Sequence, residues 1–101
     1  MPCVYILQCS DGSLYVGSTT SMDLRLAQHN DGTGAVYTRS RRPVTLLWRE
    51  DYENVADAFA MEKRIQNWSR AKRQALINGD FDELQRLSRS TAKRRRLRGG
   101  K

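Results

Sequence analysis

Glu62 is one residue of this chain whose type and position suggest a chemical role. In a helix, Ala58 and Ile65 would lie on neighbouring positions of an apolar stripe, which places the Glu62 carboxylate at the border of a core. One interpretation is a half-exposed glutamate paired with a nearby arginine, which is the more common arrangement. The other is a carboxylate ligand for a hard divalent cation such as Mg²⁺, which prefers oxygen ligands and keeps several waters.

Arg25 and His29 form a second candidate pair, because a spacing of four residues places both side chains on one face of a helix. The plainer interpretation is a solvated arginine and a structural histidine. Neither residue by itself therefore indicates a site.

Tyr5 and Tyr15 lie in two short apolar and aromatic runs, residues 3–9 and residues 14–18, separated by the turn sequence Ser10-Asp11-Gly12-Ser13. This pattern predicts a β-hairpin. An aromatic pair on neighbouring strands that packs under a helix is the plainer interpretation of the two rings.

The length of the hairpin loop decides which side chains share a face. A two-residue loop of Asp11 and Gly12 mixes apolar and polar residues on one face. A three-residue loop with Gly12 in the left-handed conformation gives one wholly apolar face. We prefer this second register, which places Tyr5 opposite Gly17 and Tyr15 diagonally adjacent, both on the face away from the core.

The elements after the hairpin alternate between helix and strand. A short helix is predicted over about residues 22–30, with Ser21 as its cap and Asp31-Gly32 at its end. Residues 32–42 are expected to form a basic loop, and residues 44–49 a third strand.

A longer helix is predicted over about residues 54–68. Its apolar stripe has spacings of three and four residues and consists of Ala58, Met61, Ile65 and Trp68. Ser69 is expected to cap a further helix that ends near Asn78-Gly79. Asp80 with Glu83 resembles a capping box that opens a last helical turn or two.

The 101 residues, 39% apolar and 29% charged, can build one compact core, which excludes two independent domains. The net charge of +7 comes from 18 Lys and Arg against 11 Asp and Glu. Eight of the cations follow the last acid, so residues 1–85 carry a net charge of −1. We therefore expect one domain over residues 1–85 and a basic, disordered tail over residues 86–101.

Cys3 and Cys9 cannot form a disulfide within one strand, because six residues of extended chain span about 20 Å. One histidine and no Cys-x-x-Cys are too few ligands for a zinc site. No apolar run approaches the roughly 18 residues of a membrane span, and the N-terminus lacks a secretory signal. Reduced thiols and these absences favour a cytoplasmic protein without membrane contact.

Basic residues in the middle of the chain are candidates for contacts with nucleic-acid phosphates. They are Arg39, Arg41 and Arg42 in the expected loop, and Lys63, Arg64, Arg70, Lys72 and Arg73 around the two longer helices. The plainer interpretation of such a run of charge is a solvated face. The basic tail would add affinity without sequence preference, because it reads backbone charge rather than base edges.

The order of several short motifs resembles the GIY-YIG nuclease pattern: Val4-Tyr5-Ile6, Tyr15-Val16-Gly17, Arg25 to His29, and Glu62 on a later helix. The small stand-alone bacterial members have stretches similar to Tyr37-Thr38-Arg39, Arg42-Pro43-Val44 and Trp68-Ser69-Arg70-Ala71-Lys72. The resemblance covers residues 2 to about 80, and its order and spacing make it fairly specific. Ser18 departs from the pattern, since some members carry a lysine near this position that assists the tyrosine.

The resemblance implies an α/β (α+β) fold, with a small three-stranded sheet that starts with a hairpin and is flanked by helices. It also implies cleavage of a phosphodiester with one divalent metal, Mg²⁺ or Mn²⁺. Tyr5 and Tyr15 match the tyrosines that position or activate water, and Arg25 matches the arginine that steadies the phosphoryl charge. His29 matches an accessory position, and Glu62 matches the metal-binding glutamate.

These roles agree with the chemistry of the side chains. A tyrosine with a pKa near 10 is a poor base at neutral pH unless a nearby cation lowers that value. Reaction at a phosphate also needs fixed positive charge, which Arg25 and a metal ion could supply.

We therefore expect a divalent-metal-dependent endonuclease that acts on DNA, or on RNA, in a structure-related or repair-related process and as a monomer. A non-catalytic nucleic-acid-binding module of the same fold is the alternative, and a basic partner of ribosomes or RNA is a third. The intact set of Tyr5, Tyr15, Arg25 and Glu62 favours the enzyme. The absent lysine and the basic tail favour a binding role.

Overall fold

A computed structural model of the chain describes residues 1–88. These residues belong to two compact units, one formed by residues 1–67 and the other beginning at Trp68. The sequence predicted one domain over residues 1–85, followed by a tail. Residues 86–88 of that tail belong to the helical residues 81–88, and the rest of it lies outside the described residues. Within residues 1–88, no helix is long and apolar enough to span a membrane.

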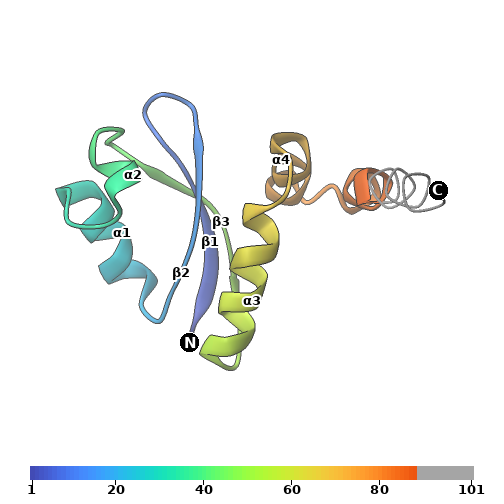
Figure 1. The fold of residues 1–101 in the computed structure, drawn as a ribbon, viewed down its shortest axis with the longest axis horizontal. Coiled ribbons are helices and arrows are strands. Elements are labelled where there is room, and N and C mark those ends of the chain that lie inside the picture. Colours follow the sequence, from blue (N-terminus) through green and yellow to red (C-terminus); the bar gives the residue numbers. More distant parts are fainter. Residues whose placement is uncertain (89–101) are drawn as a thin grey trace, which may run out of the picture. The chain divides into compact units, whose positions relative to one another are not determined.

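The first unit contains the expected three-stranded sheet (Figure 1). Its strands are β1 (Cys3–Gln8), β2 (Leu14–Thr19) and β3 (Thr45–Asp51). Their order is β2-β1-β3, and both neighbouring pairs are antiparallel. The predicted fold of a small sheet that starts with a hairpin and is flanked by helices is therefore confirmed.

The hairpin between β1 and β2 has the three-residue loop that the apolar pattern favours. Tyr5 is paired with Gly17, and Leu7 with Tyr15. The Cys9 amide donates to the Ser13 carbonyl oxygen at 2.8 Å, and Gly12 has a φ of +84°. A residue with a Cβ rarely adopts this left-handed conformation, so Gly12 allows the turn that sets the register.

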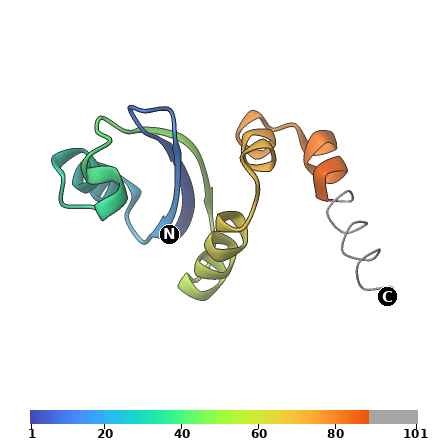
Figure 2. The same ribbon diagram turned by 45° about the horizontal axis from the view of Figure 1, so that its top comes forward.

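Both faces of the sheet are covered, which corrects the expectation that the tyrosines face away from the core. Helix α1 (Met22–Asp31) and helix α2 (Val36–Arg39) lie on one side of the sheet, and helix α3 (Val55–Gln66) lies on the other (Figures 1 and 2). The face towards α1 has its own apolar cluster, which contains Cys3, Tyr5, Leu7, Cys9, Met22 and Val44. The central strand β1 is therefore buried on both faces, and Tyr5 is a core residue.

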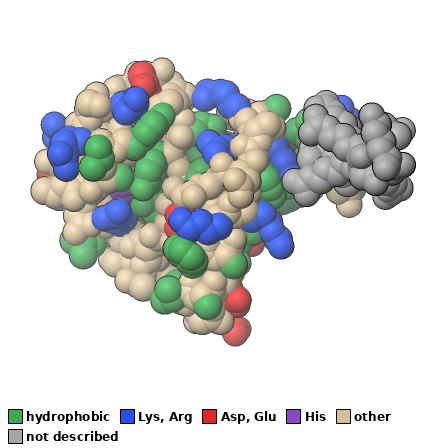
Figure 3. Space-filling model, in the orientation of Figure 1, with side chains coloured by type: hydrophobic (Ala, Val, Ile, Leu, Met, Phe, Trp, Pro, Cys, Tyr) green, Lys and Arg blue, Asp and Glu red, His purple; other side chains and the backbone are tan. Residues whose placement is uncertain are grey.

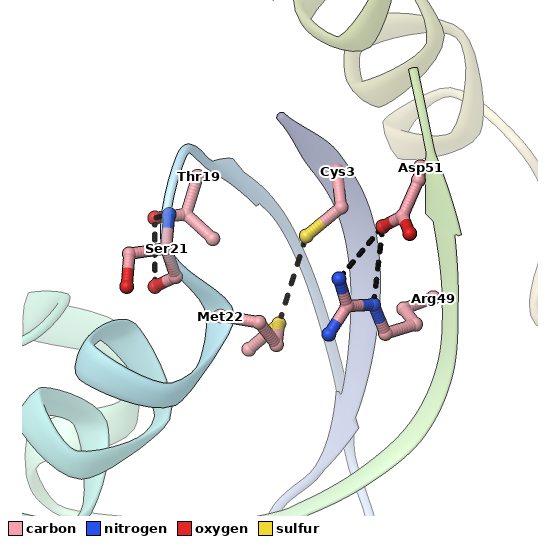
Figure 4. Close-up of polar contacts among 6 residues, drawn as sticks. All are labelled: Cys3, Thr19, Ser21, Met22, Arg49 and Asp51. Atoms are coloured by element: carbon pink, nitrogen blue, oxygen red, sulfur yellow. Dashed lines mark hydrogen bonds and ion pairs between the residues drawn. The ribbon is translucent and has the colours of Figure 1, made fainter. Parts of the chain in front are cut away.

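The start of α1 differs in detail from its prediction. Ser21 stands at the N-cap position, but its side chain makes no capping hydrogen bond. Instead, the Ser21 amide donates to the Thr19 hydroxyl oxygen at 3.2 Å, and the Cys3 thiol lies 3.9 Å from the Met22 sulfur (Figure 4). Cys3 and Cys9 are both free and buried, as the strand spacing predicted.

The region expected to be a basic loop contains the short helix α2, which packs against α1. Four residues are too few to show a helical period, so the sequence pattern does not predict this helix. Helix α1 ends, as predicted, at Gly32 with a φ of +91°.

The later helices begin and end close to the predicted residues, about 54–68 for α3 and Ser69 to Asn78-Gly79 for the helix that follows it. The Asn54 side chain accepts a hydrogen bond from the Asp57 amide at the start of α3, which buries Ala58 and Ile65. In the second unit, helix α4 (Arg70–Asn78) is capped by Ser69. Asp80 accepts a hydrogen bond from the Glu83 amide, as in one half of the expected capping box.

Candidate active site

A chain of hydrogen bonds joins β1, α1 and α2 beneath the surface of the first unit. The Tyr5 hydroxyl lies 2.8 Å from His29 Nε2, and His29 Nδ1 lies 2.8 Å from Thr38 Oγ1. The Thr38 hydroxyl also lies 3.1 Å from the Ala35 carbonyl oxygen. Tyr5, His29 and Thr38 are all 0% exposed, so these bonds are shielded from water.

Arg25 lies one helical turn before His29 and reaches the same place. Its guanidinium lies beside the hydroxyls of Tyr5 and Tyr15, and its interaction with Tyr5 is the largest cause that raises the arginine's own pKa. A second contact, 3.2 Å from Arg25 Nη1 to Gln28 Oε1, holds the guanidinium from its own helix. The predicted sharing of one helix face by Arg25 and His29 thus places both beside the hairpin tyrosines.

Burial determines how these groups titrate. It raises the pKa of Tyr5 to about 12, although the neighbouring Arg25 acts in the opposite direction. Burial also raises the pKa of Tyr15. For His29, burial and then the positive charge of Arg25 lower the pKa. At neutral pH the site therefore holds two neutral phenols, a neutral imidazole and one guanidinium cation.

Aromatic rings continue the site from the core towards the surface. The ring centroids of Tyr15 and His29 are 5.2 Å apart, and those of Tyr15 and Tyr37 are 5.9 Å apart in a stacked arrangement. The Arg41 guanidinium lies 4.0 Å from the centroid of the Tyr37 ring. The Tyr37 ring thus contacts both Tyr15 and Arg41, and Tyr37 supports Tyr15.

Glu62 is held next to the hairpin from α3. Its Oε1 accepts a hydrogen bond of 2.5 Å from the Ser18 hydroxyl, and its Oε2 accepts one of 2.7 Å from the side-chain amide nitrogen of Gln66. Gln66 also donates to the Val16 carbonyl oxygen at 3.3 Å. The carboxylate side chain is only 12% exposed. Its negative charge contributes to raising the pKa of both Tyr5 and Tyr15, so Glu62 acts electrostatically on the two phenols.

The partners of Glu62 decide how the carboxylate can be used. Its nearest cation is Lys63, whose Nζ lies 3.7 Å from Oε2, and none of its described contacts is to an arginine. Ser18 and Gln66 are neutral, so they orient the carboxylate without removing its charge. The simple pairing with arginine does not describe this glutamate.

This donor set fits a hard divalent cation. No group of three or more His, Cys, Asp or Glu side chains within residues 1–88 could hold a metal ion. A cation at Glu62 would therefore take one carboxylate from the protein and its remaining ligands from water and substrate. Mg²⁺ and Mn²⁺ accept such oxygen-rich, partly hydrated coordination.

Two glycines allow the buried groups to approach the backbone. A Cβ on Gly17 would lie 2.5 Å from the Tyr5 hydroxyl oxygen. A Cβ on Gly34 would lie 2.7 Å from His29 Nδ1. Neither position has room for a side chain, so Gly17 and Gly34 fix where the phenol and the imidazole lie.

The sequence did not predict several contacts of the site. Gln66 follows Glu62 by four residues, so its position on the same helix face could have indicated a partner. In the sequence, Ser18 stands out only as a departure from the family pattern. Thr38 and Gly34 gave no usable signal, because their contacts with His29 depend on how the segment after α1 folds back.

The three arginines predicted to bind nucleic acid around α2 have different surroundings. Arg41 forms an ion pair with Asp11 at 3.0 Å and donates to the Tyr37 carbonyl oxygen at 2.8 Å. Arg42 donates to the carbonyl oxygens of Arg39 and Asn30. The exposed Arg39 side chain makes no hydrogen bond or ion pair with any described residue, so it remains the most available of the three for an external phosphate.

Basic and apolar side chains are interspersed over the part of the first unit that carries α1 and α2 (Figure 3). Lys63 adds a cation on α3 next to Glu62. Arg70, Lys72 and Arg73 belong to α4 in the second unit, where the Lys72 ammonium lies 4.4 Å from the centroid of the Trp68 ring. Their predicted contacts with nucleic acid remain a prediction.

The GIY-YIG catalytic domain family matches residues 1–75 of the chain. The chain belongs to the GIY-YIG family. This match covers the whole first unit and the start of the second, and it includes all five residues predicted to be catalytic: Tyr5, Tyr15, Arg25, His29 and Glu62. The GIY-YIG fold is of a nuclease type.

Several relatives of this GIY-YIG protein are named only as UPF0213 proteins. One from Halobacterium salinarum is 48% identical over 74 residues, which are 73% of this chain and 96% of the relative. Another, from Bacillus pumilus, is 45% identical and covers 72% of this chain and 74% of the relative. These names do not state an activity.

Two solution NMR structures resemble the GIY-YIG chain. The UPF0213 protein BH0048 from Bacillus halodurans has a TM-score of 0.51 and 39% identity, and the match covers 77% of this chain and 84% of that protein. The protein EF2693 from E. faecalis has a TM-score of 0.54 and 34% identity, with coverage of 78% and 84%. Each match covers 84% of the neighbour, so the shared domain makes up most of each of these two proteins.

Proposed function

We propose that this GIY-YIG protein is a divalent-metal-dependent endonuclease that hydrolyses phosphodiester bonds in DNA, in a structure-related or repair-related process. The observation that carries the proposal is the convergence of one oriented, negatively charged carboxylate, Glu62, with the Tyr5, His29 and Arg25 cluster. Hydrolysis of a phosphodiester needs a cation site, a fixed positive charge and a route for the proton of the attacking water. These groups provide all three.

Tyr5 and His29 can move a proton together. The raised pKa of Tyr5, about 12, keeps the phenol neutral at pH 7, so a standing phenolate is not the base. His29 has a lowered pKa and is therefore neutral and able to accept a proton at Nε2. The Tyr5 oxygen takes the proton of an attacking water as its own proton passes to His29.

Arg25 and Glu62 supply the fixed charges of the proposed reaction, one positive and one negative. Arg25 lies against both phenol oxygens and would stabilise the negative charge that develops on the phosphoryl oxygens in the transition state. A bound Mg²⁺ or Mn²⁺ would polarise the phosphate and neutralise part of its charge. Ser18 and Gln66 hold both oxygens of Glu62 for such an ion.

The deep burial of Tyr5 supports a second candidate function, a nucleic-acid-binding module without catalysis. A phenol that is 0% exposed must be reached through the half-buried Tyr15. If no substrate opens this path, the basic side chains would bind nucleic acid while the cluster would only stabilise the fold. The two candidates differ in cleavage, not in binding.

A cleavage assay separates the two functions. Purified protein is incubated with Mg²⁺ or Mn²⁺ and single-stranded, duplex, flapped and junction DNA, with RNA versions alongside. Wild type is expected to cut at least one DNA form. Glu62→Gln is expected to lower that rate by about 100-fold or more while it retains or slightly tightens binding, because an anion facing the phosphate is removed.

Glu53→Gln is the matched control, since it makes the same chemical change at an exposed glutamate close to the start of α3. It is expected to cut at the wild-type rate. Equal residual cleavage by wild type and Glu62→Gln would assign the activity to a contaminant or another site and favour the binding module. A lower melting temperature with weaker binding in Glu62→Gln would indicate a purely structural glutamate.

A further inference from the structure

We infer that Thr38 is a positioning residue that fixes His29 as its Nδ1–H tautomer, so that the free Nε2 lone pair accepts the Tyr5 hydroxyl proton. Two separate counts of donors and acceptors lead to this assignment. Its tautomer part depends only on the geometry of the buried chain. Its catalytic part rests on the proposed function.

The first count concerns the single hydroxyl hydrogen of Thr38. The hydroxyl lies 3.1 Å from the Ala35 carbonyl oxygen, which can only accept a hydrogen bond. When Thr38 donates to Ala35, its oxygen must accept at its other contact, the one of 2.8 Å with His29 Nδ1. His29 Nδ1 then carries the hydrogen.

The second count concerns Tyr5 and leads to the same tautomer. The guanidinium of Arg25 beside Tyr5 has only donors, so it offers the Tyr5 hydroxyl hydrogen no acceptor. The hydrogen bond of the Tyr5 hydroxyl is the one with His29 Nε2, so a hydrogen on Nε2 would place a donor there as well. The Tyr5 hydroxyl hydrogen, which is completely buried, would then have no acceptor among the contacts of the site. Only the Nδ1–H tautomer gives every hydrogen in this chain an acceptor.

The His29 ring is surrounded by neighbours on several sides. Four elements face it: Tyr5 from β1, Tyr15 from β2, Arg25 on its own helix α1, and Thr38 from α2. The close approach of Gly34 to Nδ1 and to the His29 backbone closes the remaining side. Thr38 is the only one of these neighbours that hydrogen-bonds to Nδ1 within the described part of the chain.

Thr38 therefore acts through His29 and is buried away from any substrate. A histidine in the Nε2–H tautomer could not accept the Tyr5 proton, whatever its distance from the phenol. The hydroxyl of Thr38 thus determines whether the imidazole can serve the phenol as a base.

The chain has one histidine, so the tautomer can be read directly from the ¹⁵N resonances of a single imidazole ring. Wild type at neutral pH is expected to show a protonated Nδ1 and an unprotonated Nε2. Thr38→Ser keeps the hydroxyl and is expected to give the same spectrum. Thr38→Val keeps the shape without the hydroxyl and is expected to lose the strong preference for Nδ1–H.

A wild-type protein whose His29 is in the Nε2–H tautomer would overturn the inference. This measurement needs no variant, so the inference can be tested even if Thr38→Val does not fold. An unchanged Nδ1–H tautomer in folded Thr38→Val would also overturn it, because Thr38 would not be the residue that fixes the ring.

The catalytic part is tested by cleavage over a range of pH. Thr38→Val is expected to cut at least about tenfold more slowly than wild type, with an altered pH profile, and Thr38→Ser to restore both; a wrong histidine tautomer costs about 10⁴-fold in serine proteases. Normal cleavage by Thr38→Val would overturn the positioning role while the nuclease stands. An inactive wild type with the Nδ1–H tautomer would overturn the proposed function and the catalytic part, but not the tautomer.

Discussion

The single residue on which most of the site converges is His29. It contacts a phenol on one nitrogen, a hydroxyl on the other and an aromatic ring edge-on, all without exposure to water. Such a pocket stabilises the neutral imidazole, because protonation would place a second positive charge near Arg25 in a poorly solvated place. The lowered pKa of His29 is thus a consequence of packing and of Arg25, and it has a measurable effect on stability.

The free energy of unfolding is expected to fall as the pH drops below about 6.5, the ordinary pKa of histidine. In this window the unfolded chain binds a proton at residue 29 and the folded chain does not, so acid favours unfolding until the lowered folded-state pKa is passed. Urea unfolding at a series of pH values measures the slope.

His29→Gln is expected to lack this slope, although its absolute stability is also lower. No second histidine confuses the comparison, since the chain has one. If the free energy of unfolding changes with pH in the same way for wild type and His29→Gln between about pH 7 and pH 5, the imidazole has the same pKa in the folded and unfolded chain, which would contradict this prediction.

At the scale of elements, β2 and the turn that precedes it connect the site to its supports. β2 is joined to α3 through Ser18 and Glu62, and the turn is joined to the end of α2 through Asp11 and Arg41. The Ser10 amide also donates to the Arg41 carbonyl oxygen at 2.9 Å. Arg41 is therefore a brace between the turn and α2, which explains why a residue predicted to bind nucleic acid is engaged within the protein.

Helix α3 must begin at a defined residue for Glu62 to reach Ser18, and the Asn54 cap defines that start. Asn54→Ala is expected to lower the free energy of unfolding by about 1 kcal/mol, because it leaves the Asp57 amide without its capping acceptor. Chemical denaturation followed by circular dichroism measures this loss.

Ser21→Ala provides the comparison, since Ser21 has the same N-cap position on α1 but no capping hydrogen bond from its side chain. We expect Ser21→Ala to change stability by less than about 0.5 kcal/mol. Equal losses in the two variants would show that the Asn54 contact does not decide where α3 begins.

At the scale of the whole molecule, the charge is divided very unevenly along the chain. Residues 89–101 contain seven of the 18 Lys and Arg and none of the 11 Asp and Glu, so the remaining 88 residues have no net charge. The charge that attracts a polyanion over a distance is thus carried by a segment outside the described residues, while the site lies in the first unit.

Removal of residues 89–101 is expected to weaken DNA binding and to reduce its dependence on salt, because fewer counterions are released on binding. The melting temperature is expected to stay close to that of the full chain. A version with the seven cations replaced by serine keeps the length and serves as the control. Binding titrations at several salt concentrations test both versions, and an unchanged salt slope in either would contradict this role of the charge.

The sequence by itself determined the features that depend on a few neighbouring residues. Gly12 and the alternation of side chains set the hairpin register, and with it the pairing of Tyr5 with Gly17. Ser69 and the two left-handed glycines Gly32 and Gly79 marked helix ends. Turns, caps and periodicity act over one to four residues, so their effects can be read locally.

Only the tertiary structure decided which distant side chains meet. Tyr5 and His29 are 24 residues apart, and Ser18 and Glu62 are 44 apart, so no local pattern specifies either hydrogen bond. The burial of Tyr5 also depends on α1 covering a face of the sheet that alternation alone marked as the less apolar one. Contacts of this kind arise because the whole unit must bury its apolar surface at once, and every buried polar group must then find a partner among whatever side chains that packing brings together.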